Sequence, residues 1–533
     1  MPRIETVVGA ASKLFPVDPP SSVLSFFAPR LEAAMLFVTP SVFARFAIAV
    51  AAIPAIFQLV TFAVLPTTIW LPISAALLPV QVSSVLVIVH RTSRRRRAVE
   101  GELPFVAMLF FILSHESYAN LPDAFKKIEQ LGPEIFPAFF AEAQNLARNL
   151  TYGIEPELGT AERTFVSHPS RQLREFIHGY LTTLETGRDV HEFVRVESER
   201  FLTTQEDRWR SFTALLSSMT EVSFIFLAVF PVGVQMIAGT FPGVGASFLL
   251  LTSLALLSVV TVALLLWMDF AQPPSHDARY PPALLVCLVL GFLVILALYQ
   301  AGLIDSVVAA ALSLGCASAY EYRVRGFFGR LGEGEKEVAV MLHDLAELTR
   351  AGVELPPALS RLIDGSAGFR SIGDDLSAFS RLLLLGQSPL AARRRLAHPS
   401  WLVKVSFALL AVSFETGGGY DQLDKLSLSF RRLSDARRSI QASVIPFALL
   451  GVVVPVVSSA SFWFLRSMQS LGPVLPLFAI QSGASGTGGS IVASSLLAGL
   501  IVSKAYSQSL RSMVGVPPLL ASALISFLIF GSA

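Results

Sequence analysis

Two His-acidic pairs are the first candidates for chemistry in this sequence. His115-Glu116 begins like the zinc-binding helix of a metalloprotease, but that motif needs a second histidine four residues after the first, and position 119 is Ala119. His343-Asp344 lies on the charged side of a helical pattern, where such a pair is more often solvated than catalytic. Neither pair predicts catalytic or metal chemistry.

The sequence also lacks the patterns that bind nucleotides. No G-x-x-x-x-G-K-[ST] segment is present, so the chain has no P-loop. The glycine-rich stretch SGASGTGG ends at residue 489 and contains no lysine, and we interpret it as a loop. Cys287 and Cys316 lie apart in apolar stretches and make neither a disulfide framework nor a metal site. We therefore expect no cofactor and no enzymatic activity, and the energy for any mechanical work must come from a partner.

A repeated pattern is the most informative feature of the chain. Residues 167–187 and 397–417 each contain His-Pro-Ser, then fourteen residues, then Glu-Thr-Gly. Serine is a favoured N-cap, so Ser170 and Ser400 are expected to begin helices of about four turns. Glycine adopts a left-handed conformation easily, so Gly187 and the second copy's glycine are expected to end them. The duplication predicts two related modules in one chain.

Each repeat places a glutamate in the last helical turn, Glu185 in the first copy and Glu415 in the second. A negative charge is unfavourable at this end of a helix dipole, so a nearby arginine such as Arg163 or Arg393 is expected to compensate. The simplest interpretation is that the pattern marks helix boundaries. A second interpretation is that the two glutamates contact a partner.

Helical periodicity continues through both modules. Apolar residues between 338 and 348 recur every three or four positions and form one helix face: Val338, Met341, Leu342, Leu345 and Leu348. Gly352 is expected to end that helix, and Leu355-Pro356-Pro357 to begin the next one. Asn120 and Leu121-Pro122 repeat this arrangement in the first module. Each module should be a bundle of roughly six helices that ends in a long charged helix.

Composition indicates a membrane protein. Apolar residues make up 53% of the 533 residues and charged residues only 15%, against about 25% in soluble proteins. A spanning helix needs about 20 mostly apolar residues. Nine stretches fit this requirement: 46–65, 67–89, 222–242, 246–267, 283–303, 305–320, 442–464, 489–508 and 515–532.

The positions of the basic residues predict the topology. HRTSRRRRAVE follows the second predicted span and YEYRVRGFFGR follows the sixth, and such arginine-rich segments are retained in the cytoplasm. Both soluble modules and the N-terminus are then cytoplasmic, and the C-terminus is external. The predicted organisation has five parts: residues 1–90 with two spans, 91–217 as the first module, 218–320 with four spans, 321–440 as the second module, and 441–533 with three spans.

On this pattern the chain resembles a known family. AVMLHDLAELTRAGVELPPALSRL is similar to the start of a type II secretion system F domain, and two such domains with nine spans resemble the archaeal membrane platform of archaella and type IV pili. The resemblance extends from about residue 91 to 465. It implies an all-α, polytopic protein of the cell membrane that acts as a homodimer. It also implies contacts with a hexameric secretion ATPase and with pilin or archaellin subunits, which are passed into a filament.

Charge suggests which surface meets the ATPase. Residues 321–440 contain 17 basic and 14 acidic residues, whereas residues 91–217 contain 16 basic and 18 acidic ones. The excess in the second module predicts contact with an acidic surface, and the alternative is a solvated helix face near the membrane. Together with Glu185 and Glu415, the candidate contact residues are Arg393, Arg394, Arg395, Arg431, Arg432, Arg437 and Arg438.

The main rival to the platform is a transporter or export permease, and an intramembrane protease is a more distant one, because no Ser-His, paired-Asp or zinc set appears within the predicted spans. A transporter or export permease also contains internal repeats, but there the repeated unit is a set of membrane helices around a midplane site. Here the likeness lies in the soluble modules, and the spans divide as two, four and three. A nucleic-acid partner is not expected, because the basic residues lack interleaved aromatic residues and a basic domain.

Overall fold

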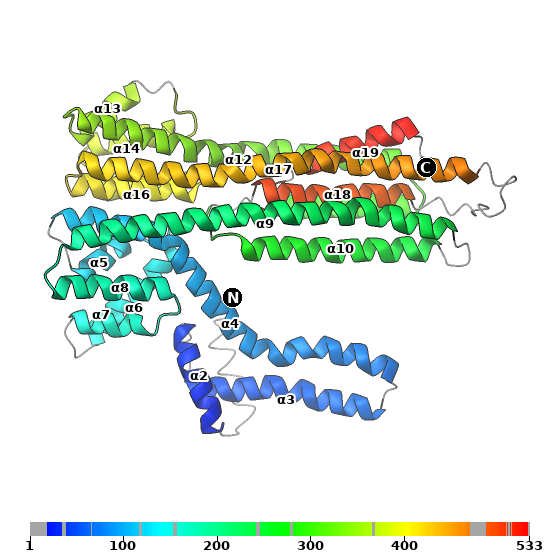
Figure 1. Ribbon diagram of the computed structural model, residues 1–533, viewed down its shortest axis with the longest axis horizontal. Coiled ribbons are helices and arrows are strands. Elements are labelled where there is room, and N and C mark those ends of the chain that lie inside the picture. Colours follow the sequence, from blue (N-terminus) through cyan, green and yellow to red (C-terminus); the bar gives the residue numbers. More distant parts are fainter. Residues whose placement is uncertain are drawn as a thin grey trace. The chain divides into compact units, whose positions relative to one another are not determined.

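The computed structural model describes most of the chain, and every statement below concerns those residues. The described ranges are 19–34, 39–64, 67–116, 120–152, 157–240, 246–274, 276–277, 281–364, 368–469, 487–507, 509, 512 and 514–530. Within these ranges every regular element is a helix, which confirms the all-α prediction (Figure 1). The chain divides into two compact units, Met1–Phe201 and Leu202–Ala533.

The first module is built from helices α4 to α9. Its short helices carry apolar residues on one face and bury that face, as Leu121, Phe125 and Ile128 do in α5. The bounds are α4 Thr67–Leu113, a 3-10 turn at Ser114–Glu116, α5 Leu121–Leu131, α6 Pro137–Tyr152, α7 Glu157–Val166, α8 Arg171–Glu185 and α9 Val190–Thr240.

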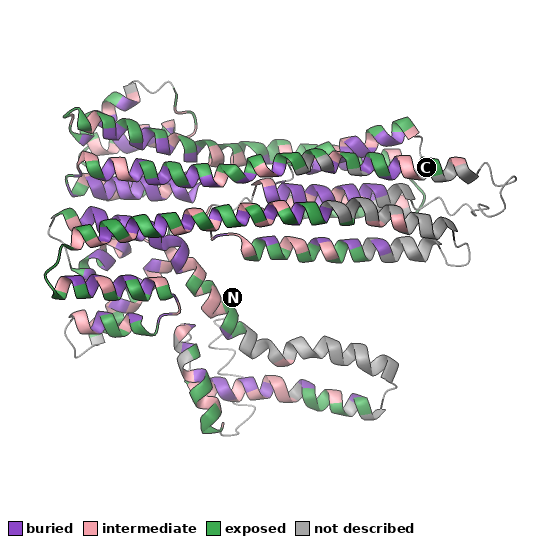
Figure 2. Cartoon of the chain, in the orientation of Figure 1, coloured by how far each residue is buried: buried purple, intermediate pink, exposed green. Residues whose placement is uncertain are grey.

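The second module repeats this order of elements. Its bounds are α12 Ser306–Arg350, α13 Leu355–Asp364, α14 Gly373–Leu384, α15 Pro389–Arg393, α16 Trp401–Glu415 and α17 Tyr420–Gln469. The predicted face of α12 is confirmed, since Val338, Met341, Leu342 and Leu345 are fully buried and Leu348 is half-buried. Helix α16 is buried along most of its length (Figure 2).

Several helix boundaries follow the sequence signals. The hydroxyls of Ser170 and Ser400 accept hydrogen bonds from the backbone N–H three residues later, which confirms both as N-caps. Gly187, Gly352 and Gly417 have φ values of 64°, 82° and 67°, so each takes the left-handed conformation that an ordinary residue avoids. The repeated pattern therefore does mark the start and the end of corresponding helices.

Four long helices each contain an apolar stretch and a charged stretch with no break between them. Helix α4 leads into the first module and α9 leads out of it, while α12 and α17 do the same for the second module. In the second unit α12 and α17 lie side by side (Figure 1). Each module is thus joined by continuous helix at both its ends to residues that the sequence predicts to be membrane-spanning.

The remaining described helices are mainly apolar. They are α2 Ser21–Ala33, α3 Pro40–Val64, α10 Ala246–Ala271, α11 Pro282–Gln300, α18 Thr487–Ser507 and α19 Val516–Phe530. Within the described ranges, two segments are long and apolar enough to cross a membrane, Pro40–Leu59 and Tyr420–Ser461, and shorter apolar helices accompany them. The figure of nine spans therefore stays a prediction.

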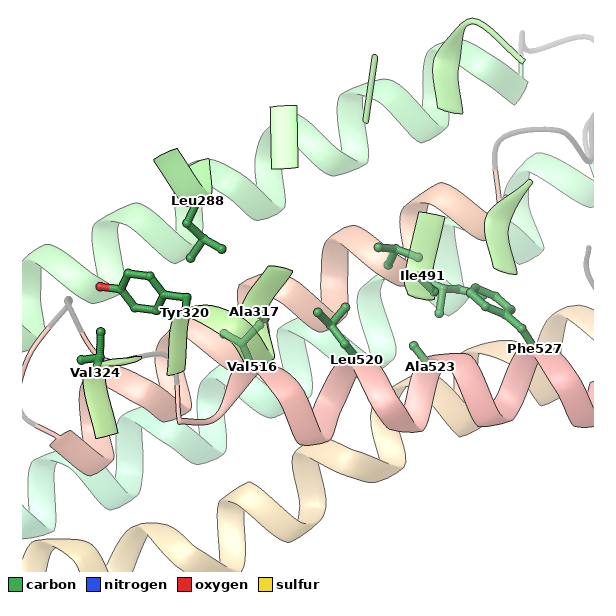
Figure 3. Packing of buried hydrophobic residues seen from close by; sticks show 11 residues of the cluster. Leu288, Ala317, Tyr320, Val324, Ile491, Val516, Leu520, Ala523 and Phe527 are labelled. Carbon is green, nitrogen blue, oxygen red and sulfur yellow. The ribbon is translucent and has the colours of Figure 1, made fainter. Parts of the chain in front are cut away.

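The apolar helices of the second unit share a core. Side chains from α11, α12, α18 and α19 meet there, among them Leu288, Tyr320, Ile491 and Phe527 (Figure 3). Small residues bring backbones close, since a Cβ on Gly499 would lie 2.7 Å from the Cα of Val516. Such close approach through small residues is typical of helices that pack within lipid.

Candidate functional site: two equivalent polar clusters and a charged junction

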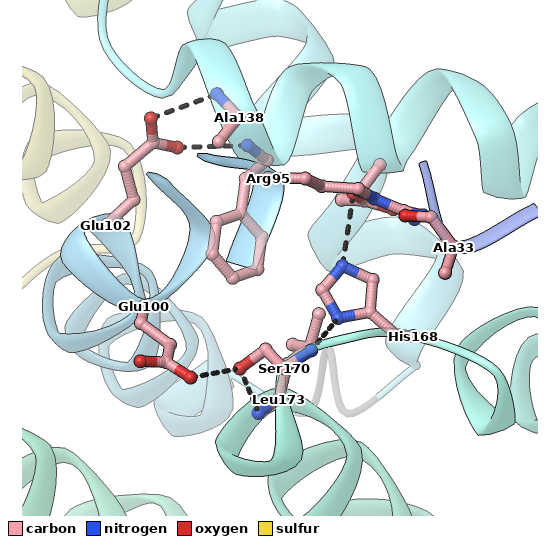
Figure 4. Close-up of polar contacts among 10 residues, drawn as sticks. Ala33, Arg95, Glu100, Glu102, Ala138, His168, Ser170 and Leu173 are labelled. Carbon is pink, nitrogen blue, oxygen red and sulfur yellow. Dashed lines mark hydrogen bonds and ion pairs between the residues drawn. The ribbon is translucent and has the colours of Figure 1, made fainter. Parts of the chain in front are cut away.

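Each His-Pro-Ser segment forms a buried polar cluster with the long helix that enters its module. In the first module the Ser170 hydroxyl donates to Glu100 Oε1 at 3.2 Å, and the Ser170 backbone N–H donates to His168 Nδ1 at 3.0 Å (Figure 4). In the second module Ser400 donates to Glu335 at 3.1 Å, and its N–H donates to His398 Nδ1 at 3.1 Å. The serine, histidine and glutamate of each cluster are all buried.

These bonds determine which histidine nitrogen carries the proton. Nδ1 accepts a hydrogen bond in both clusters, so in the neutral ring the proton lies on Nε2. His168 Nε2 donates to Glu142 Oε1 at 3.2 Å. His398 Nε2 instead donates to the Ser371 hydroxyl at 3.3 Å, and that hydroxyl donates to the Arg330 carbonyl.

The first cluster contains a largely buried ion pair between Arg95 and Glu142. Arg95 contacts both carboxylate oxygens of Glu142 at 2.8 Å, and its Nη1 also donates to the Ala33 carbonyl (Figure 4). Burial raises the pKa of Glu142, but the hydrogen bonds from His168 and Arg95 outweigh burial and hold that pKa below its usual value. Glu142 is therefore ionised in the folded protein at neutral pH.

Among the described contacts, no carboxylate pairs with His398, the histidine of the second cluster. Burial and the positive charges of Lys404 and Arg330 lower the pKa of His398 to about 4, and the negative charge of Asp277 only partly opposes this fall. Asp375 lies at the position in α14 that corresponds to Glu142 in α6, and burial raises its pKa. His398 is consequently neutral at physiological pH, and the two modules hold one histidine in different electrostatic surroundings.

A second pair of glutamates caps a neighbouring helix in each module. Glu102 accepts hydrogen bonds from the backbone N–H groups of Ala138 and Phe139, at the start of α6, both at 2.9 Å. Glu337 accepts from three consecutive N–H groups just before α14, those of Arg370, Ser371 and Ile372. A carboxylate at this position satisfies otherwise unpaired N–H groups and complements the helix dipole.

Among the described contacts, the second module alone contains a charged junction, which is a set of ion pairs centred on Arg437. Arg437 of α17 makes ion pairs with Glu335 of α12 and with Asp277, which lies in the loop between α10 and α11. Asp277 also accepts a hydrogen bond from the Trp401 N–H at the start of α16, at 2.9 Å. The guanidinium of Arg437 lies 5.1 Å from the centre of the Trp209 ring.

The junction therefore joins three parts of the second unit: helices α12 and α16 of the module, the exit helix α17 that leads out of the module, and the loop between α10 and α11. Counted from the start of the exit helix, the position of Arg437 is occupied by Asp207 in α9. The first module has no arginine there and instead uses Arg95 and Arg96 of α4, of which Arg96 bonds Glu100 at 2.9 Å.

The structure separates the predicted contact residues into two groups. Arg393 is buried, with 6% of its surface exposed, and Arg437 is held in the junction, so neither presents a guanidinium to a partner. The contact role of these residues stays a prediction, and an arginine-rich sequence did not indicate which of them face the core. The others lie on exposed positions: Arg394, Arg395, Arg431, Arg432, Arg438, Glu185 and Glu415.

The residues that sequence reasoning missed are Glu100, Glu102, Glu335 and Glu337. Their signal was present as a Glu-x-Glu pattern at the same place in each module, 70 and 65 residues before the capping serine. Asp277 carried no signal, because its partner Arg437 is 160 residues away in the chain.

The chemistry of these clusters is structural. The two capping hydroxyls are buried, and each already donates to a glutamate and accepts a backbone N–H, so neither is available as a nucleophile. Within the part of the chain that the structure describes, no group of three or more His, Cys, Asp or Glu side chains could hold a metal ion. Comparison with known protein families, curated proteins and solved structures found no match.

Proposed function

We propose that this protein is a membrane platform of a filament-assembly machine related to archaella or type IV pili. It would couple a cytoplasmic secretion ATPase to the insertion of pilin-like subunits. The observation that carries this proposal is that the serine, histidine and glutamate core of one polar cluster recurs in two helical modules. A transported solute needs no second soluble module, whereas a machine driven from the cytoplasm benefits from two similar places at which force is applied.

The continuous helices supply the mechanical link in this proposal. Helix α17 runs 50 residues from the second module into an apolar stretch, which at 1.5 Å per residue is about 75 Å. Pro446 and Pro455 lie within α17 and each removes a backbone hydrogen bond, so a tilt of the module would move the part of α17 before Pro446 as one rigid arm. The junction of Arg437 with Glu335 and Asp277 would pass the same movement to the loop between α10 and α11.

The exposed arginines are the proposed ATPase contact. Arg394 and Arg395 lie at the end of α15, and Arg431, Arg432 and Arg438 lie on α17. Their complement would be an acidic surface on the ATPase, and the attraction would steer association and weaken with salt.

The test is to tag the protein in its native cell, cross-link it, and identify what co-purifies in mild detergent. We expect a hexameric ATPase and small proteins with an apolar N-terminal helix. Changing Arg394 and Arg395 to glutamate should remove the ATPase, while the matched double change of the exposed Arg361 and Arg370 should retain it. Recovery of a nucleotide-binding transport subunit, or of no ATPase, would contradict the proposal.

A transporter or export permease remains the second candidate, on the basis of one observation. Lys504 of α18 is 4% exposed and bonds Asp269 of α10 and Gln272, the residue after that helix, at 2.7 and 2.9 Å. A buried charge in an apolar helix is often part of a transport pathway. Solute flux through the purified protein in liposomes, lost in Lys504→Met, would favour this candidate over the platform.

A further inference from the structure

An open groove runs along α12 in the second module. It has a volume of about 740 Å³ and lies between α12 and the end of α13. Its apolar lining consists of Val340, Leu348, Leu362 and Phe369, and Val340 is 44% exposed. An exposed valine on a helix whose other face is fully buried indicates a second surface suited to contact.

The groove is edged by acidic side chains. Glu333, Glu337, Asp344 and Glu347 line it, against a single lysine, Lys336. Glu337 is occupied by the backbone N–H groups before α14, and Glu347 lies 3.8 Å from Arg350. Glu333 adds a negative charge at one end of the groove, and Asp344 adds another between Val340 and Leu348. This local charge is opposite to the net positive charge of the module.

The matching positions of the first module are buried. The shared Glu-x-Glu pairs align α4 with α12 at an offset of 235 residues, which places Phe105, Leu109 and Ile112 opposite Val340, Asp344 and Glu347. All three first-module residues are apolar and buried. The matching helix positions are thus apolar and buried in the first module but acidic and open in the second. We attribute this difference to a contact that the second module makes with a partner.

We propose that this groove binds a cationic amphipathic helix of a partner protein. The apolar strip receives the partner's leucine-like side chains, and the carboxylates on its edges pair with lysine or arginine on the flanks. From Glu333 to Leu348 the groove follows 15 residues of α12, about 22 Å, so the bound segment is about four helical turns. An amphipathic helix that places its apolar face in such a groove is a common recognition mode.

This inference goes beyond the proposed platform function and does not depend on it. The proposed ATPase contact consists of arginines and takes an acidic surface, whereas the groove takes a basic helix. Two surfaces of opposite charge on one module can select two different partners. The groove can also be tested without ATPase or filament subunits.

The probe is a fluorescent 18-residue peptide with leucines on one helix face and lysines on both flanks. It is titrated with the full chain in nanodiscs of zwitterionic lipid, and binding is measured by fluorescence anisotropy. We expect binding above that of empty nanodiscs, at least tenfold tighter than for a scrambled peptide of the same composition. Replacing the lysines of the peptide by glutamate should abolish binding.

Asp344→Lys and, independently, Glu347→Lys should each weaken binding at least tenfold. The control is Asp435→Lys on α17, an exposed site that makes the same change of charge away from the groove. Unchanged tryptophan fluorescence shows that each variant is folded. Equal binding of the ordered and scrambled peptides, equal loss in Asp344→Lys and Asp435→Lys, or no binding above empty nanodiscs overturns the proposal.

Discussion

Replacing Arg437 tests the junction most directly. In Arg437→Met, Glu335 and Asp277 lose their shared cation while they remain largely buried, with side-chain exposures of 7% and 16%. Removing one partner of a buried ion pair typically costs about 3–5 kcal/mol of stability, because the other charge is left uncompensated. Met fills a similar volume, so little of this cost arises from a cavity.

The double variant Glu335→Gln/Arg437→Met separates charge from packing. It removes one of the two stranded carboxylates, so we expect it to recover more than about 1 kcal/mol relative to Arg437→Met alone. The neighbouring exposed Arg438→Gln is the control, with an expected change within about 0.5 kcal/mol.

The assay is chemical denaturation of the full chain in mild detergent, followed by tryptophan fluorescence. Two of the five tryptophans, Trp209 and Trp401, contact the junction, so part of the emission reports on it. If Arg437→Met is no less stable than Arg438→Gln, or if the effects of Glu335→Gln and Arg437→Met simply add, the junction is not the coupled charge network described above.

Three further predictions concern the clusters. First, burial lowers the pKa of His398 to about 4. The unfolded protein then binds the proton more readily, so the contribution of His398 to stability rises as pH rises from about 4 to 6.5. Burial raises the pKa of Glu335 to about 7, so the contribution of Glu335 to stability falls as pH rises from about 4.5 to 7. Relative to the unmodified chain, the slope of the denaturation midpoint against pH should therefore become more positive in Glu335→Gln and more negative in His398→Asn, and equal slopes in the two variants would contradict this reasoning. Second, a Cβ on Gly334 would lie 2.5 Å from His398 Cε1, whereas one on Gly332 meets nothing within 4 Å. Gly334→Ala should cost about 1–3 kcal/mol and Gly332→Ala should be neutral or stabilising by up to about 1 kcal/mol, measured by the same denaturation. Third, Ser170→Ala and Ser400→Ala should each cost about 1–2 kcal/mol, since each loses an N-cap and a donor to a buried glutamate; hydrogen exchange should show faster opening at the first turn of α8 or α16, and protection equal to that of the unmodified chain would rule out the capping role.

The local structure of this protein was largely predictable from its sequence. Helix faces, serine N-caps and helix ends at glycine depend on residues three or four apart, and the chain contains these signals twice. The prediction that Ser170 and Ser400 begin helices at matching places is confirmed, whereas the proposed module boundaries stay a prediction. The Glu-x-Glu pattern also lay in the sequence, but without a structure nothing linked it to a serine 65 or 70 residues later.

Tertiary structure decided which charged residues are buried and which are exposed. Arg393, Arg394 and Arg395 are identical in type and adjacent in sequence, yet only the first is buried. Arg437 and Arg438 differ in the same way, because successive residues of a helix point about 100° apart and only packing determines which direction is inward. The junction with Asp277 and the groove along α12 likewise depend on segments brought together from distant parts of the chain. The sequence by itself therefore determined the helices, their boundaries and the duplication, since these depend on near neighbours. Only the folded structure shows which charged side chains are buried or paired, since burial and ion pairing depend on distance in space.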